Sequence, residues 1–438
     1  MEKLRHTLRV RKERAILVAA VPRSYGERDD LTELTALAES AGAVIVDRFQ
    51  QKIHAINPAT YIGKGKADQL AQRVKRFKAD VVIFDNDLSP AQIRELEEII
   101  RAKVLDRSEL ILDIFATRAK TKQAKLQVEL AQLEYTYPRL TRMWIHLDSL
   151  AGAGGATTAG VVGGIGTRGP GEQQLEIDRR LVSKRITELK RELVNIDKRR
   201  IREINGRKRL FKICIVGYTN AGKSTLLNAL TDAGALVEDR LFATLDTRTK
   251  RWSPARGAEV LVSDTVGFVK NLPHQLVASF KATLEEAINA DLLLHIIDVS
   301  NPDALKQIES VDAVLQEIGC GQKPILKVLN KVDCLQSLSQ LEMLQTMFDD
   351  AIAISAKTGY GLDKLAEKVA EAYKGGELLV RVSSPQSNGK VQSFLRAHGQ
   401  IVNEQYLDGF VLIDARLGQN QLTDLKRLHP ETIEIVDA

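Results

Sequence analysis

The sequence is poor in cysteine and aromatic residues, and it has no long apolar run. Its three cysteines, Cys214, Cys320 and Cys334, have neither a metal-binding spacing nor the pattern of a disulfide framework. The longest apolar stretches, residues 15–21 and 291–298, are far shorter than the roughly 20 residues that cross a bilayer. These shortages exclude a disulfide-stabilised scaffold and a transmembrane helix. We therefore expect a cytoplasmic protein, with peripheral membrane association as an alternative.

The composition is that of a globular protein, and the length predicts several domains. Hydrophobic residues make up 44% and charged residues 27% of the 438 positions, which indicates neither disorder nor a fibre. The order of the expected elements predicts an α/β protein. Its expected parts are a small α/β domain (1–118), an antiparallel helical hairpin with a glycine-rich loop at 152–171 (119–209), a doubly wound α/β domain (210–374) and a small ferredoxin-like α+β domain (375–438).

The first and last of these parts differ in the order of their elements. From residue 14 to about residue 118, each apolar, β-branched segment is followed by a segment of helical period, which is typical of a parallel sheet. Ser89 and Pro90 provide a helix cap and a first helical residue. After residue 376 the pattern is instead strand, helix, strand, strand, helix, strand.

Two long helical segments enclose the glycine-rich loop. Leu126, Leu130 and Leu133 lie on one face of the first segment. The second carries an apolar seam at spacings of 4, 3, 4 and 3, which predicts that the two helices pack as a hairpin. A plain flexible linker is the alternative interpretation of residues 152–171. Because long loops inside compact chains are more often functional, we favour a binding loop.

Positive charge is concentrated next to this loop. Residues 178–212 contain 14 Lys or Arg against 5 Asp or Glu, an excess of 9 that is larger than the net charge of +6 on the whole chain. Such clustering favours a polyanionic partner such as RNA, although a solvated helix face is an equal alternative. The candidate RNA contacts are Arg168, Arg179, Arg180, Lys184 and Arg185.

The segment VGYTNAGKST, residues 216–225, has the P-loop pattern G-x-x-x-x-G-K-S. It follows an apolar strand and begins an amphipathic helix, which is the context that this motif requires. The glycines let backbone N–H groups turn toward phosphates, and the helix N-terminus favours their charge. Lys223 is expected to neutralise the β- and γ-phosphates, and the Ser224 hydroxyl to ligate Mg²⁺.

Three later segments select GTP over ATP. Residues 264–267 form D-x-x-G, in which Asp264 can hold Mg²⁺ through water and the Gly267 amide can contact the γ-phosphate. Residues 330–333 form N-K-x-D, and the Asp333 carboxylate can accept hydrogen bonds from the N1–H and N2–H₂ donors of guanine. Adenine lacks this donor pair. Residues 355–357 (SAK) can then contact the guanine O6 and cover the ring.

A switch threonine and a water-orienting group complete such a site. Residues 242–249 (FATLDTRT) contain three candidates for the threonine, namely Thr244, Thr247 and Thr249. Phe268 stands where many small GTPases have a water-orienting glutamine, and a phenyl ring cannot bind the attacking water. We therefore expect slow intrinsic hydrolysis and a group supplied from elsewhere.

From about residue 14 to residue 374 the chain resembles the HflX family of ribosome-associated GTPases. The segments that carry the resemblance include YIGKGK (61–66), GGIGTRGPGEQQLEIDRR (163–180) and LFATLDTRT (241–249). The resemblance implies that Thr244 is the second Mg²⁺ ligand beside Ser224. It also implies binding to the large ribosomal subunit near the peptidyl-transferase region, and splitting or rescue of stalled ribosomes or a role in their assembly. Departures from the family pattern are Gln173 and Ile177 in place of threonines and Thr247 in place of a proline.

Together, the motifs and the resemblance give a candidate site with Lys223, Thr244 and Gly267 as catalytic residues and Mg²⁺ as cofactor, in a protein expected to be a monomer. The expected GTP contacts are Gly217, Tyr218, Thr219, Asn220, Ala221, Gly222, Lys223, Ser224, Thr225, Phe242, Ala243, Thr244, Leu245, Asp246, Asp264, Thr265, Val266, Gly267, Asn330, Lys331, Val332, Asp333, Ser355, Ala356 and Lys357.

Two other functions fit parts of the sequence. An ATP-driven RNA remodeller would use residues 61–66 as a second phosphate loop, but that segment lacks the P-loop spacing. A regulatory GTPase that acts away from ribosomes would keep all of the GTP motifs. Association with large ribosomal subunits would distinguish a ribosome-associated GTPase from this regulatory GTPase.

Overall fold

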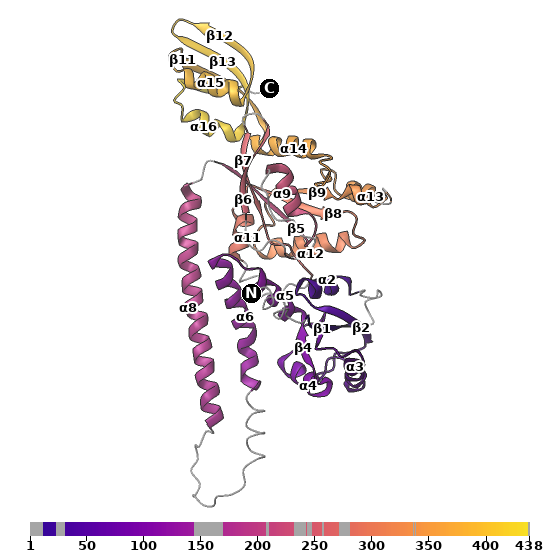
Figure 1. The fold of residues 1–438 in the computed structure, drawn as a ribbon. Coiled ribbons are helices and arrows are strands. Elements are labelled where there is room, and N and C mark those ends of the chain that lie inside the picture. The colour runs from indigo at the N-terminus through magenta and orange to yellow at the C-terminus, as the bar shows by residue number, and fades with distance from the viewer. Residues whose placement is uncertain are drawn as a thin grey trace, which may run out of the picture. The chain divides into compact units, whose positions relative to one another are not determined.

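The computed structural model describes residues 12–22, 31–143, 170–206, 210–231, 242, 248–255, 258–270, 281–335, 337 and 339–436. The chain divides into two compact units, whose helices and strands are labelled in Figure 1. The first comprises Met1–Glu203, Asp239–Asp246 and Asn271–Ala282, and the second comprises Ile204–Glu238, Thr247–Lys270 and Thr283–Ala438.

The first unit contains a four-stranded parallel sheet of order β2-β1-β3-β4. Its helices lie between the strands in sequence, which confirms the predicted parallel α/β domain. The core beside the sheet includes Ile16, Val18, Val82 and Phe84, all buried. The elements are β1 (Arg14–Pro22), α2 (Thr32–Ser40), β2 (Val44–Ile53), α3 (Lys64–Phe77), β3 (Val81–Phe84), α4 (Pro90–Ile100), β4 (Lys103–Asp106) and α5 (Arg107–Arg118).

Two long helices, α6 (Lys122–Met143) and α8 (Pro170–Gly206), form the helical hairpin. Leu126, Leu130 and Leu189 are buried between them. Helix α8 begins at Pro170 and so takes in the last two residues of the predicted loop, because proline is well tolerated in the first turn of a helix. The predicted apolar seam is therefore present.

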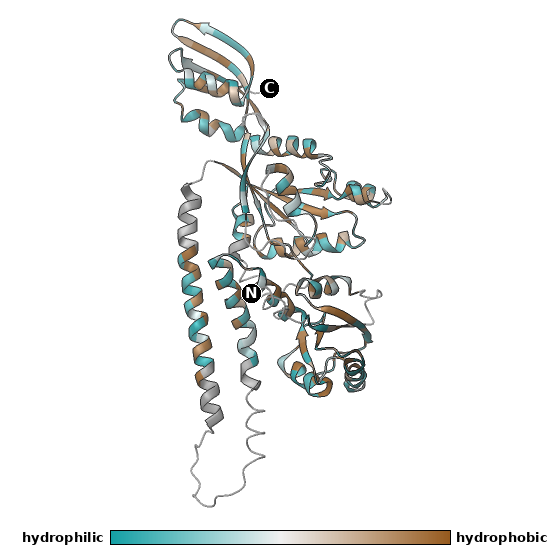
Figure 2. Cartoon of the chain, in the orientation of Figure 1, coloured by the Kyte–Doolittle hydropathy of each residue, from teal (hydrophilic) through white to brown (hydrophobic). Residues whose placement is uncertain are grey.

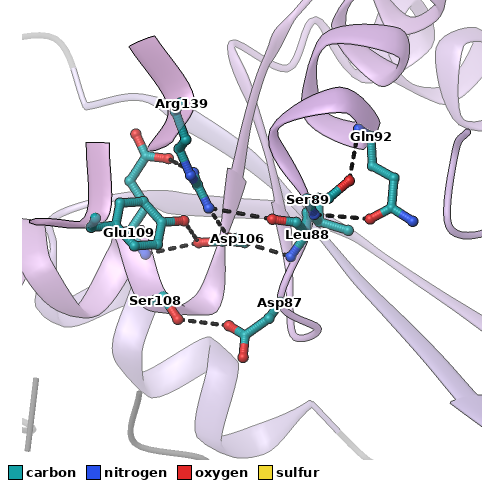
Figure 3. A network of polar contacts seen from close by, with 9 residues as sticks. Asp87, Leu88, Ser89, Gln92, Asp106, Ser108, Glu109 and Arg139 are labelled. Atoms are coloured by element: carbon teal, nitrogen blue, oxygen red, sulfur yellow. Dashed lines mark hydrogen bonds and ion pairs between the residues drawn. The ribbon is translucent and has the colours of Figure 1, made fainter. Parts of the chain in front are cut away.

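A buried carboxylate at the end of β4 joins α6 to the sheet (Figure 3). Asp106 is fully buried and accepts hydrogen bonds from the Leu88 and Glu109 backbone N–H groups, the Tyr135 hydroxyl and the Arg139 guanidinium. The Arg139 guanidinium also stacks on Tyr135, 3.6 Å from the ring centroid. These donors offset the cost of burying the Asp106 carboxylate, and two of them, from Tyr135 and Arg139, connect α6 to the end of β4.

Glu109 beside this network predicts a pH dependence of the first unit. Burial, followed by the nearby Asp106 carboxylate, raises the pKa of Glu109 to about 7, against the opposing charges of Arg139 and Lys103. The folded state therefore binds this proton more tightly than the unfolded state. The stabilisation is present below the ordinary pKa and is lost as the pH rises through about 7.

We expect Glu109→Gln to slow amide hydrogen exchange in β4 and α5 at pH 8, on the order of ten-fold, because an amide carries no charge to bury. At pH 5 the variant and the wild type should exchange alike. The exposed Glu39 on α2 provides the matched control as Glu39→Gln. An unchanged exchange ratio between pH 5 and pH 8 would contradict this prediction.

The second unit begins with a six-stranded sheet of order β10-β9-β8-β5-β7-β6, in which only β6 runs antiparallel to its neighbour. Its central strands are buried on both faces and largely brown in Figure 2. The predicted α/β domain is confirmed. The elements are β5 (Phe211–Gly217), α9 (Lys223–Thr231), β6 (Arg248–Ala255), β7 (Ala258–Asp264), α11 (Lys281–Ile288), β8 (Leu292–Asp298), α12 (Ala304–Glu317), β9 (Ile325–Asn330), η1 (Val332–Cys334), α13 (Ser339–Met347), β10 (Ile352–Ala353) and α14 (Leu362–Lys374).

An antiparallel sheet of order β12-β13-β11-β14 follows, as predicted for the C-terminal part. Val380, Val382 and Ile413 of this sheet share a buried core with Val391 and Leu425 of the two helices that follow β11 and β13. Among the described residues, no helix is both long and apolar enough to span a membrane. The elements are β11 (Glu377–Pro385), α15 (Gly389–His398), β12 (Gln400–Leu407), β13 (Phe410–Gly418), η2 (Gln419–Gln421), α16 (Leu422–Lys426) and β14 (Thr432–Val436).

Candidate nucleotide-binding site

The loop between β5 and α9 needs both of the glycines in the P-loop pattern. Gly217 has φ 149° and Gly222 has φ 96°. A Cβ atom on Gly217 would lie 2.4 Å from the Ile296 carbonyl oxygen, and one on Gly222 would lie 2.3 Å from Asn330 Nδ2. Neither approach leaves room for a side chain.

Lys223 begins α9 with its side chain turned back over the loop. Its ammonium donates to the carbonyl oxygens of Gly217 (3.1 Å) and Tyr218 (2.7 Å). Burial lowers the pKa of Lys223 to about 8, against the attraction of Asp264. An anion beside this buried ammonium would offset the free-energy cost of burying its charge. The loop is therefore suited to binding phosphate.

A hydroxyl and a carboxylate meet beside the lysine. Asp264 ends β7 and is fully buried, and Ser224 Oγ donates to its Oδ2 at 2.7 Å. Hydroxyl and carboxylate oxygens are the hard ligands that Mg²⁺ prefers, so the residues present fit this ion.

The D-x-x-G segment lies directly on the P-loop. The backbone N–H of Phe268 donates to Gly217 O (3.1 Å), and that of Thr219 donates to Phe268 O (2.8 Å). Lys270 N donates to the Tyr218 hydroxyl at 2.7 Å. The Phe268 side chain is buried, and its phenyl ring carries no group that could hold a water molecule as a glutamine does.

Asn330 connects the segments expected to hold the base. Asn330 is the last residue of β9 and is buried. Its Nδ2 donates a hydrogen bond to Ala221 O at 2.8 Å, and its Oδ1 accepts one from Ala356 N at 3.0 Å. The buried Ser355 hydroxyl lowers the pKa of the exposed Asp333 carboxylate. Asp333 therefore remains a charged acceptor, as recognition of paired N–H donors requires.

The structure brings the P-loop, Asp264–Gly267 and residues 330–333 and 355–357 to one edge of the sheet. The bridging role of Asn330 and the Tyr218–Lys270 bond could not be predicted, because no local pattern in the sequence marks either of them. Ala243, Thr244, Leu245 and Asp246 lie outside the described residues.

Phe242 is the described residue of the switch segment that directly precedes the undescribed residues 243–247. It is buried with φ 57°, and its ring lies 4.5 Å from that of Phe115 on α5, edge to face. Both residues belong to the first unit. No sequence pattern predicts this pairing of rings.

The candidate RNA contacts on α8 fall into two groups. Arg179, Arg180 and Lys184 line a surface cleft of about 600 Å³ together with Tyr137. Arg185 instead forms a two-pronged ion pair with Glu129 of α6, at 2.8 and 3.1 Å, and thereby links the hairpin helices. Arg168 lies outside the described residues.

The fold and this assembly of loops define the chain as a P-loop GTPase. Residues 212–331 match the family model described as "50S ribosome-binding GTPase", residues 28–116 match "GTP-binding GTPase N-terminal", and residues 118–207 match "GTP-binding GTPase Middle Region". The chain is 43% identical over 411 residues to GTPase HflX of Lacrimispora saccharolytica, covering 92% of this chain and 93% of that protein. It is 39% identical over 434 residues to GTPase HflX of Escherichia coli K12, covering 97% of each. This chain belongs to the HflX family of GTPases.

Among solved structures, the chain is similar to a GTP-binding protein of Sulfolobus solfataricus in complex with GDP. The two are 27% identical with a TM-score of 0.41, covering 82% of this chain and 98% of that one.

Proposed function

We propose that GTP binds at the edge of the second unit's sheet with its phosphates on the P-loop and its guanine on Asp333. The observation that carries this assignment is Asn330, whose side chain joins the phosphate loop to Ala356 of the base-binding segment. Lys223 neutralises the β- and γ-phosphates, and the Gly267 amide contacts the γ-phosphate. The SAK segment at 355–357 covers the base.

Ser224 and Thr244 ligate Mg²⁺ in this arrangement, and Asp264 holds it through water. The ion supplies positive charge against the phosphate oxygens as the γ-phosphoryl group leaves. The chain's own contribution is to orient the phosphates and to keep them beside a buried ammonium, where electrostatic interactions are strong. The Ser224–Asp264 hydrogen bond supports this ligand set.

The large ribosomal subunit is the proposed partner, and the docking parts are the N-terminal domain and the hairpin. GTP binding favours docking, and hydrolysis releases the protein, as in other switch proteins. The basic cleft supports this assignment, because Arg179, Arg180 and Lys184 form no ion pair among the described side chains and can meet RNA phosphates. Splitting or rescue of stalled ribosomes is the expected outcome of such docking. The protein acts as a cytoplasmic monomer in this proposal.

The test is co-sedimentation with large subunits in a non-hydrolysable GTP analogue. We expect Arg179→Ala, Arg180→Ala and Lys184→Ala combined to weaken association and to flatten the slope of log affinity against log salt concentration by roughly 0.7–0.9 for each phosphate that is no longer neutralised. The control replaces three exposed lysines of the second unit (Lys364, Lys390 and Lys426) with alanine. If both variants lost the same affinity for large subunits, general charge attraction would explain the association and the cleft would have no specific role. A wild type that does not associate would favour the regulatory GTPase instead.

A ferredoxin-like arrangement of the C-terminal part is supported by its order of elements. The elements follow one another as β11, α15, β12, β13, α16, β14, and the strands stand in the sheet order β14-β11-β13-β12. The four-part division at residues 118, 209 and 374 is proposed on the same grounds.

A further inference from the structure

Thr219 is one of the expected GTP contacts, and no role has so far been given to its hydroxyl. The residue is only 7% exposed, and its Oγ1 has no hydrogen-bond partner in the part of the chain that the structure describes. Buried polar groups without a partner are rare in native proteins, and each calls for an explanation. An atom of the substrate or a water molecule is a natural partner.

The position of Thr219 indicates which group that is. A Cβ atom built on Gly267 would lie 2.7 Å from Thr219 Cγ2, 2.8 Å from Thr219 Cα and 2.9 Å from Lys223 Nζ. Thr219 therefore packs against the Gly267 backbone, close to the Lys223 ammonium. In the proposed nucleotide geometry both Lys223 and the Gly267 amide contact the γ-phosphate, so this phosphate lies next to Thr219.

Three other hydroxyls at this edge of the sheet already have partners. Tyr218 accepts a hydrogen bond from Lys270 N, Ser224 donates to Asp264, and Thr265 Oγ1 donates to Ile215 O. Phe268, at the usual glutamine position, is buried and apolar. The Thr219 hydroxyl can thus both donate and accept a hydrogen bond, and it lies beside the reacting phosphate of the proposed complex.

We propose that the Thr219 hydroxyl orients the water that attacks GTP. The hydroxyl accepts a hydrogen bond from the water and donates its own to a γ-phosphate oxygen. The water oxygen forms the new bond to the γ-phosphorus, the bond to the β–γ bridging oxygen breaks, and GDP leaves with that electron pair. The proton of the water passes to the released phosphate, so Thr219 is unchanged at the end. This role rests on the proposed nucleotide geometry.

The test compares Thr219→Val, which keeps the branched shape, with Thr219→Ser, which keeps the hydroxyl. Single-turnover hydrolysis should fall roughly 100-fold in Thr219→Val and only a few-fold in Thr219→Ser. Affinity for fluorescent GDP should stay within about three-fold of the wild type, because GDP lacks the γ-phosphate that the hydroxyl contacts. Binding of GDP with aluminium fluoride, which mimics the transferring phosphoryl group, should weaken in Thr219→Val by about the same factor as the rate.

A wild-type rate in Thr219→Val would overturn the assignment, and so would equal slowing in both variants. Loss of GDP affinity in Thr219→Val would also overturn it, since the residue would then hold the ground state. Failure of the proposed nucleotide site appears separately, as a wild-type protein that does not bind GTP.

Discussion

Replacing Asp333 with asparagine is expected to lower the affinity for GTP by at least about 100-fold and to remove its advantage over ATP. A carboxylate accepts hydrogen bonds from both the N1–H and N2–H₂ groups of guanine, whereas an amide presents one oxygen and one NH₂ group. The NH₂ group would face the N2–H₂ donor and leave both without an acceptor. The Asp333 carboxylate is ionised at neutral pH, and the Ser355 hydroxyl lowers its pKa further below the ordinary value.

Calorimetric titration with GTP, ATP and xanthosine triphosphate measures this effect. Xanthine carries a carbonyl oxygen in place of N2–H₂, so the variant should gain affinity for it. Asp349→Asn, an exposed position in the same unit, is the matched control. Unaltered discrimination between GTP and ATP in Asp333→Asn would show that the base binds elsewhere.

The second large effect is expected from Gly267→Ala. The new Cβ atom would meet Thr219 Cγ2 at 2.7 Å and Thr219 Cα at 2.8 Å, so the D-x-x-G segment must move off the P-loop. The Gly267 amide then loses its place against the γ-phosphate, and we expect hydrolysis to slow by about 100-fold. GDP lacks that phosphate, so its affinity should change little.

Single-turnover hydrolysis and GDP binding, measured side by side, check this prediction. Gly321→Ala is the control within the same unit, because its Cβ atom would come no closer than 3.4 Å to its nearest neighbour, Gln316 Cγ. A Gly267→Ala variant that hydrolyses GTP like the control would mean that the close approach to Thr219 is not needed for catalysis.

The elements and motifs could be predicted from the sequence because each depends on local pattern. Strands β5, β8 and β9 are short apolar runs, and the P-loop and N-K-x-D motifs follow β5 and β9 directly. The antiparallel C-terminal sheet could be predicted from the order of the strand and helix patterns after residue 376.

The contacts that organise the site could not be predicted, because they join segments far apart in the sequence. Asn330 reaches Ala221 across 109 positions, and Arg139 reaches Asp106 across 33. Arg185 stays a predicted RNA contact, and the structure adds a pairing with Glu129 on the facing helix that the sequence does not predict. Charge alone cannot tell a partner within the chain from one outside it.

The packing of Phe242 against Phe115 has a thermodynamic consequence. Only Ala243 separates Phe242 from Thr244, so the threonine can reach at most about 7 Å beyond its anchored neighbour. The positions that Thr244 can reach therefore depend on whether the Phe242 ring remains packed against Phe115 of α5. In the proposed site Thr244 ligates Mg²⁺, and it follows from that proposal that the nucleotide and a partner that displaces Phe242 from α5 change each other's affinity by the same factor.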